Sequence, residues 1–136
     1  MSAAPSTTAI ASAGSEILFE EGIIGIPRAR RFHLLERPGS PLRLLQSLDI
    51  AGFALPVVDP RFAEPDYSPT LQSRVSEALS LGDGGCVLLA VVTLGDALPT
   101  ANLRAPIVIN VDRRVGAQVI LDDRSLPLER PLAQRL

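Results

Sequence analysis

The chain is poor in the side chains that usually carry chemistry. In 136 residues it has no tryptophan and no lysine, and it contains one histidine, one cysteine, one tyrosine and four phenylalanines. So few aromatic side chains argue against a stacking platform for single-stranded nucleic acid, and they predict an aliphatic core. One histidine and one cysteine are too few for an ordinary zinc site, and a single cysteine excludes an internal disulfide.

The same scarcity argues against catalysis. His33 lies in the strand-like run Arg31–Leu35, where a satisfied or solvent-facing histidine is more common than a general base, and no G-x-S-x-G elbow accompanies it. Cys86 begins an apolar run, which predicts a buried, inert thiol. The glycine-rich stretch 82–85 lacks the lysine and hydroxyl residue of a phosphate loop. We therefore expect a protein that is not an enzyme and has no cofactor and no metal.

Charge and hydropathy limit the partners. The net charge is −2 and the isoelectric point is about 5.3, so the chain lacks the basic excess that direct nucleic-acid binding requires. No apolar stretch approaches the roughly eighteen residues of a membrane span, and the beginning of the chain does not resemble a signal peptide. We expect a cytoplasmic protein that contacts neither nucleic acid nor membrane.

The length fits one domain with a substantial core. Residues 1–14 are small and uncharged, which predicts a flexible N-terminal tail. The folded domain is expected over residues 15–132, followed by a frayed C-terminus at 133–136.

Short apolar runs separated by turn residues predict an antiparallel β architecture. The runs are Glu16–Phe19, Arg31–Glu36, Leu42–Leu48, Phe53–Val58, Cys86–Leu94, Ile107–Val111 and Ala117–Leu121. Pro56 has no N–H and therefore indicates an edge strand or a bulge within its run.

One segment has helical spacing. In Leu71–Leu81 the apolar residues recur at i, i+4, i+7 and i+8, with Ser68 and Pro69 as the expected N-cap and first residue and Gly82 as the stop. The fold prediction is therefore mainly β: a small antiparallel β-barrel with one amphipathic helix that covers an opening.

The last two runs predict a β-hairpin. Ile107, Ile109 and Val111 alternate with polar or second-face residues, and the loop before the return strand is polar and ends in Gly116. Pro106 is placed at the start of the first strand, where it removes no interior ladder bond.

This hairpin also carries a resemblance. The sequence TANLRAPIVIN at 100–110, followed by GAQVIL at 116–121, is similar to the signature of the FliW flagellar assembly factor family. Three upstream segments resemble the same family in the same order: FEEGIIGIP from Phe19, LQSLD from Leu45, and FALPVVDPRFAEPDY from Phe53. Ile26 departs from the family pattern, because an aromatic residue is expected there.

The resemblance implies a regulatory binding protein with two partners. In the family picture, flagellin occupies the factor until flagellin is secreted, and the freed factor then binds and antagonises the translational repressor CsrA. Flagellin synthesis is thereby coupled to secretion. Two mutually exclusive complexes on one rigid scaffold would serve this role.

Several polar residues are candidates for partner contact. Glu20, Glu21 and Asp59 would supply negative potential, and Gln46 and Ser47 interrupt an apolar run. Asn102 and Asn110 flank the hairpin strand, where an asparagine either ties down backbone or faces a partner. With Arg104 of the same signature, the predicted partner-binding set is Glu20, Glu21, Gln46, Ser47, Asp59, Asn102, Arg104 and Asn110. Ordinary surface and structural roles remain open for all of them.

Two other functions stay open. A small β-barrel ligand-binding protein or enzyme with an interior cavity would need convergent polar groups inside the barrel. An RNA-binding module would conflict with the acidic charge balance. The sequence leaves undecided which surface each partner takes, the oligomeric state, direct or allosteric antagonism of the repressor, and the number of flagellins.

Overall fold

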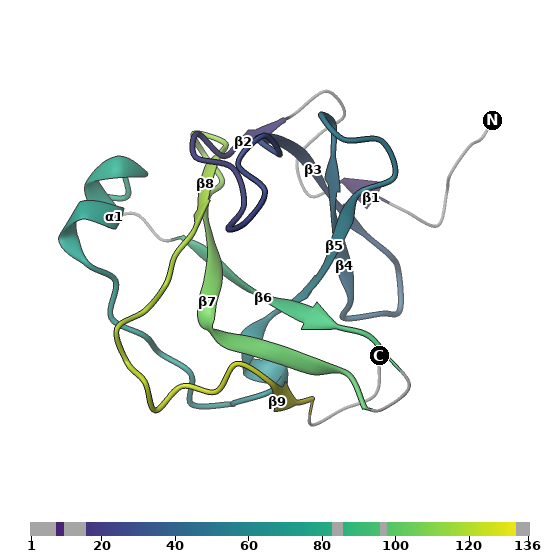
Figure 1. The fold of residues 1–136 in the computed structure, drawn as a ribbon, viewed down its shortest axis with the longest axis vertical. Coiled ribbons are helices and arrows are strands. Elements are labelled where there is room, and N and C mark those ends of the chain that lie inside the picture. Colours follow the sequence, from purple (N-terminus) through teal and green to yellow (C-terminus); the bar gives the residue numbers. More distant parts are fainter. Residues whose placement is uncertain (1–7, 10–15, 83–85, 96–97, 133–136) are drawn as a thin grey trace.

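Seven strands close into a barrel in the computed structural model, which describes residues 8–9, 16–82, 86–95 and 98–132 (Figure 1). Around the barrel the strands are β3 (Arg31–Glu36), β2 (Ile17–Leu18), β8 (Val115–Gln118), β7 (Thr100–Asn110), β6 (Val87–Thr93), β5 (Ala54–Val58) and β4 (Arg43–Ser47), and β4 returns to β3. A 3₁₀ turn η1 (Pro60–Phe62) and a helix α1 (Ser73–Ala78) interrupt the strands. The predicted fold class, mainly β with a small barrel and one helix, is confirmed.

The barrel has two narrow seams. All of its pairings are antiparallel except that of β2 with β8, which consists of the single pair Leu18 and Val115. β5 pairs with β6 only through Val57 and Val58. Pro56 precedes this pairing, so its missing N–H falls where β5 has no neighbour on that side.

Short terminal strands extend the sheet. β1 (Thr8–Ala9) pairs with β3 at Leu35 and Glu36, and β9 (Arg130–Pro131) pairs with the beginning of β7. Apart from β1, the predicted N-terminal tail lies outside the described residues, as does the predicted frayed end at 133–136.

Strand β7 differs from the prediction. It begins at Thr100, so Pro106 lies inside the strand, and every residue from Ala105 to Asn110 is buried. Pro106 lies in an irregular stretch of β7, because no residue between Asn102 and Ile107 is paired with β6, and proline is tolerated at such a bulge. In the same stretch the Asn102 Oδ1 accepts hydrogen bonds from the N–H groups of Arg104 (3.0 Å) and Ala105 (3.1 Å). The prediction that Val111 belongs to the strand is wrong, because it lies exposed in the following turn.

The core contains two clusters, one on each face of β7. Val108 packs with Val119, Leu121, Val75 of α1 and Leu79, which follows α1 directly. Ile107 and Ile109 pack in the second cluster, which contains three phenylalanines: Phe19, Phe32 and Phe53. The rings of Phe19 and Phe32 meet edge to face at 5.1 Å, so the prediction of a purely aliphatic core is wrong.

Helix α1 is shorter than predicted. It begins after Gln72, whose side chain makes no cap hydrogen bond, and it ends at Ala78. Ser68 and Pro69 therefore do not cap it. Six residues make fewer than two helical turns, so tertiary packing holds the helix in place.

The hairpin turn also departs from the prediction. Arg114 takes the left-handed position with φ of 55°, whereas Gly116 lies in β8. A Cβ at Gly116 would lie 2.9 Å from the Phe19 ring, so this glycine is required by close packing. In the part of the chain that the structure describes, no helix is long and apolar enough to cross a membrane.

Candidate functional site

A groove runs beside β8, between the segment Leu18–Ile24 and helix α1. We call it the β8 groove, and its volume is about 480 Å³. Its lining consists of Leu18, Glu20, Glu21, Gly22, Ile24, Arg74, Val75, Ala78, Leu79 and residues 115–120, which form β8 and the two positions after it. A cavity of this size lies within the usual range for binding sites, although this one is open to solvent.

The β8 groove joins exposed apolar surface to acidic charge. Ile24 and Ile120 are 48% and 59% exposed, which is unusual for large aliphatic side chains that share a concave surface. Glu20 and Glu21 are exposed at its edge, and neither forms an ion pair within the described residues. An apolar surface bordered by carboxylates suits an amphipathic partner with basic residues.

Hydrogen bonds hold the segment that ends at Ile24, one wall of the groove, against β8. The Gln118 Oε1 accepts a hydrogen bond from the Ile24 N–H (3.0 Å), and the Gln118 Nε2 donates to the Ala105 carbonyl (3.2 Å). Gln118 therefore connects the N-terminal segment to β7 through β8. Ile24 is positioned by this contact, so the groove is formed before any partner binds.

The opposite wall is held by Asn110. Its Nδ2 donates to the carbonyls of Leu79 (2.9 Å) and Ser80 (3.2 Å), and its Oδ1 accepts from the Arg113 N–H (3.2 Å). The side chain is 7% exposed. Carbonyls at the end of a helix have no intrahelical partner, and this buried amide satisfies two of the carbonyls that follow α1.

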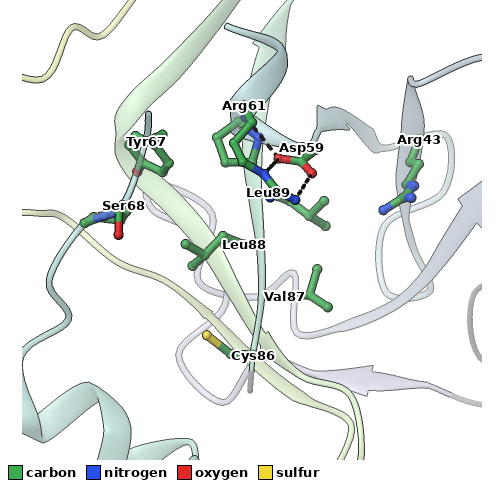
Figure 2. Close-up of a pocket in the computed structure, with 11 residues that line it drawn as sticks. Arg43, Asp59, Arg61, Tyr67, Ser68, Cys86, Val87, Leu88 and Leu89 are labelled. Atoms are coloured by element: carbon green, nitrogen blue, oxygen red, sulfur yellow. Dashed lines mark hydrogen bonds and ion pairs between the residues drawn. The ribbon is translucent and has the colours of Figure 1, made fainter. Parts of the chain in front are cut away.

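A second cavity of about 460 Å³ lies where β5 and β6 diverge (Figure 2). We call it the β6 pocket. It is lined by Arg43, Asp59, Pro60, Arg61, Tyr67, Ser68, Pro69, Cys86, Val87, Leu88 and Leu89.

Charged groups are fixed on one side of the β6 pocket. Arg61 donates from Nε to Asp59 Oδ1 (3.1 Å) and from Nη2 to Oδ2 (2.8 Å), and its N–H also donates to Oδ1 (3.0 Å). The side-chain hydrogen bonds from Arg61 hold the pKa of Asp59 below its usual range. Asp59 is therefore ionised and fully engaged.

The other polar groups of the β6 pocket are not activated. The Tyr67 hydroxyl donates to the Leu103 carbonyl (2.7 Å), and burial raises the pKa of Tyr67 to about 12. Burial also raises the pKa of the Cys86 thiol, which keeps the thiol protonated. Cys86 is only partly buried, which corrects the prediction of a buried thiol.

Comparisons with known proteins agree with this barrel. The family model described as "FliW protein" matches residues 4–132. The chain belongs to the FliW family. It is 35% identical over 124 residues to the flagellar assembly factor FliW of Bdellovibrio bacteriovorus, covering 88% of this chain and 71% of that protein. It is 36% identical over 124 residues to the factor of the same name from Thermotoga neapolitana, covering 88% and 83%.

A solved structure is similar throughout the barrel. The crystal structure titled as the flagellar assembly factor FliW superposes with a TM-score of 0.82 at 31% sequence identity. The match covers 91% of this chain and 89% of that chain. The family resemblance read from the hairpin and the upstream segments is confirmed.

The predicted contact residues of this FliW-family chain fall in separate places. Glu20 and Glu21 lie together in the β8 groove, whereas Asp59 lies in the β6 pocket. Neither cavity is lined by Gln46 or Ser47. The Ser47 Oγ accepts from the Ile50 N–H (2.9 Å), and the Gln46 Nε2 donates to the Phe53 carbonyl (3.1 Å), so both organise the turn after β4.

The signature residues make internal contacts. Arg104 donates from Nε to the Leu126 carbonyl (2.9 Å) and from Nη2 to the Arg124 carbonyl (3.0 Å), which fastens the C-terminal segment to β7. Asn102 and Asn110 bond to main-chain groups as described above. The signature TANLRAPIVIN thus positions backbone, and its role in partner contact stays a prediction.

Sequence reasoning missed the apolar half of the β8 groove. Val119 and Leu121 are buried, and Ile120 alternates with them, so the strand pattern already placed a large aliphatic residue on the outward face. An isoleucine on the outward face of a strand was the available sign of an apolar surface. No comparable signal marked Ile24, because its position depends on a contact with Gln118 across 94 residues.

Proposed function

We propose that this FliW-family protein binds flagellin and, when free of flagellin, binds and antagonises the translational repressor CsrA in the cytoplasm. It would act by binding, without catalysis. The observation that carries the proposal is the β8 groove, where Ile24 and Ile120 are exposed beside Glu20 and Glu21. Relatives named flagellar assembly factors supply the biological setting.

For flagellin, we propose capture of a terminal amphipathic helix. Such a helix presents apolar side chains at i, i+3, i+4 and i+7, and these would insert between α1 and the segment Leu18–Ile24. The exposed isoleucines would then become buried, which supplies the driving force for association.

For CsrA, we propose that the carboxylates of Glu20 and Glu21 contribute to the contact. Because these residues border the same groove that would hold flagellin, the two complexes would compete. Competition of this kind lets the concentration of free flagellin decide how much factor is available to the repressor.

The proposal is tested by calorimetric titration of the purified chain with CsrA of the source organism, followed by flagellin in competition. We expect binding of CsrA that flagellin displaces. Absence of binding to both proteins would contradict the proposal, and binding of both at once would contradict the shared groove.

Two sets of variants locate the contacts. Ile120→Ser should weaken flagellin binding about tenfold or more, as expected for an isoleucine buried on association. Leu128→Ser is the matched control, because Leu128 is 52% exposed and lines neither cavity. An equal effect of both variants would exclude the groove as the flagellin site.

Charge-reversal variants test the proposed contact of Glu20 and Glu21 with CsrA. The double variant Glu20→Arg and Glu21→Arg should weaken CsrA binding at low salt, with a smaller loss at high salt because ions screen exposed charges. Glu129→Arg reverses an exposed charge outside both cavities and serves as the control. Unchanged affinity and unchanged salt dependence in the double variant would remove these carboxylates from the interface.

A further inference from the structure

The first half of strand β6 has an edge with no neighbouring strand. β6 pairs with β7 from Val87 to Thr93, whereas its pairing with β5 reaches only Ala90 and Val91. The β6 pocket opens beside the unpaired part (Figure 2). An otherwise closed barrel thus presents one short strand edge inside a cavity.

The direction of the main-chain groups on this edge follows from the neighbouring strands. The Val119 N–H donates to the Pro106 carbonyl (2.9 Å), so the main chain of Pro106 is directed toward the β8 side. Hydrogen-bonding direction alternates along an antiparallel strand. Ile107 and Ile109 therefore direct their main-chain groups toward β6.

The partners of these two isoleucines on β6 are Leu89 and Val87. Both direct their N–H and carbonyl groups toward β7, and Leu88 between them directs its groups to the opposite edge. Within the described residues, no hydrogen bond joins the main chain of Leu88 to a group on that side. The Leu88 N–H and carbonyl thus face the β6 pocket.

The chain's own β5 does not satisfy this edge. Continuing the register of Val58 with Ala90 would bring Pro60 opposite Leu88, and proline has no N–H to donate. Asp59 also turns the chain away, because its carboxylate caps η1 by accepting from the Arg61 N–H. The break in pairing is therefore fixed by local sequence.

The charged groups that line the pocket are unequal in number. Two arginines and one aspartate line it, and both carboxylate oxygens of Asp59 are engaged by Arg61. Arg43 forms an ion pair with Glu36 (3.3 Å), which does not belong to the lining. Arg43 is therefore the one cation of the lining whose carboxylate partner lies outside it, so a carboxylate that enters the pocket can share the Arg43 guanidinium with Glu36.

We propose that the β6 pocket binds an extended peptide segment of a partner protein that carries an acidic residue. The segment adds a short strand to β6, exchanges main-chain hydrogen bonds with Leu88, and places its carboxylate beside Arg43. Strand addition to an exposed edge is a common mode of peptide recognition, in which main-chain bonds supply affinity and side chains supply specificity. This site differs from the β8 groove and does not depend on the function proposed for that groove.

The test uses the full chain labelled with ¹⁵N and the blocked peptide acetyl-Ser-Val-Thr-Glu-Val-Thr-Ser-amide. In the free protein, the amide of Leu88 should exchange with solvent faster than those of Val87 and Leu89, which are bonded to β7. The peptide should slow exchange at Leu88 about tenfold or more at saturation and should shift its amide resonance. The amides lining the β8 groove should not change.

Two replacements separate the main-chain and charge contributions. A peptide with glutamine in place of glutamate should bind about threefold to tenfold more weakly, and Arg43→Gln should remove this difference between the peptides. Ile120→Ser in the β8 groove is the matched control and should leave peptide binding unchanged.

Three results would overturn the proposal. One is strong protection of the Leu88 amide in the free protein at every concentration, which would mean that the edge is already satisfied. Another is protection that rises with protein concentration without peptide, which would identify a second copy as the occupant. The third is the absence of any peptide-induced change at Leu88. Because none of these measurements involves flagellin or CsrA, they leave the function proposed for the β8 groove untouched.

Discussion

The buried amide of Asn110 holds the end of helix α1 by donating to the Leu79 carbonyl at 2.9 Å. Leu79 packs in the core against residues of β7 and β8, so this bond fixes a wall of the β8 groove. A strand residue of the family signature thereby positions the helix that lines the β8 groove. The relationship explains why an asparagine occupies an apolar strand.

Replacing Asn110 should therefore loosen the helix. Asn110→Ala removes the donor to Leu79 and Ser80, leaving the carbonyl of the buried Leu79 unsatisfied, and should lower the free energy of unfolding by about 1–3 kcal/mol. Urea unfolding followed by circular dichroism measures the change. Val111→Ala, at the exposed next position, is the control. A loss no larger than that of the control would show that the bond contributes little.

The glycine at position 116 should be intolerant of a methyl group. In Gly116→Ala the new Cβ would meet the Phe19 ring at 2.9 Å and the Val108 carbonyl at 3.2 Å. Overpacking of this kind should destabilise the fold by about 1–3 kcal/mol, measured as the shift of the thermal midpoint.

Gly95→Ala is the matched control for Gly116→Ala, because a Cβ at Gly95 would meet nothing within 4 Å. It should leave the midpoint nearly unchanged. Equal midpoints for the two variants would mean that the Phe19 ring moves aside without penalty.

Local patterns predicted most of the barrel. The run Arg31–Glu36 is β3 as predicted, because alternation and turn residues act over a few neighbouring positions. The predicted helix began too early. Ser68 and Pro69 were expected to start it, but the backbone of residues 68–72 is not helical. The position of Pro106 was predicted wrongly because β7 begins at Thr100 and its pairing with β6 is interrupted between Asn102 and Ile107, which no local pattern indicated.

The candidate site was predictable only in part. Glu20 and Glu21 were identified from charge, yet their association with Ile120 depends on a contact between Ile24 and Gln118 that no local pattern encodes. Outside the two cavities, the structural role of Asp49 was not predicted, although Asp49 belongs to the family segment LQSLD. Its Oδ2 accepts from the N–H groups of Arg30 (2.9 Å) and Arg31 (2.7 Å), which joins the turn after β4 to the start of β3. Sequence spacing gives no indication of this pairing.

Asp49 should make the free energy of unfolding depend on pH in the acidic range. Hydrogen bonds from the Arg31 and Arg30 main chain, and then from the Arg31 side chain, hold the pKa of Asp49 below its usual value. The carboxylate therefore contributes stability above its unfolded pKa, about 3.9, and loses that contribution as the pH falls through the lower folded pKa. Asp49→Asn should flatten the fall in stability below about pH 4.

The measurement for Asp49 is the free energy of urea unfolding between pH 2 and pH 7 for the wild type and Asp49→Asn. Asp112→Asn is the control, because Asp112 is an exposed aspartate of the hairpin turn. If Asp49→Asn retained the full acid dependence, other carboxylates would be responsible for it.

The ionisation of Tyr67 can be followed directly at alkaline pH, because Tyr67 is the only tyrosine in the chain. Burial raises the pKa of Tyr67 to about 12. Relative to an unfolded pKa of about 10, the neutral phenol contributes stability that is fully present below about pH 10 and is lost as the pH rises toward the folded pKa. The absorbance of the phenolate should therefore rise near pH 12 in the folded protein and near pH 10 in urea.

Tyr67→Phe should abolish the signal and, by leaving the Leu103 carbonyl without its donor, destabilise the fold by about 1 kcal/mol. Ser68→Ala, at the exposed neighbour, should do neither, and a phenolate midpoint near pH 10 in the folded wild type would contradict the buried position of the phenol.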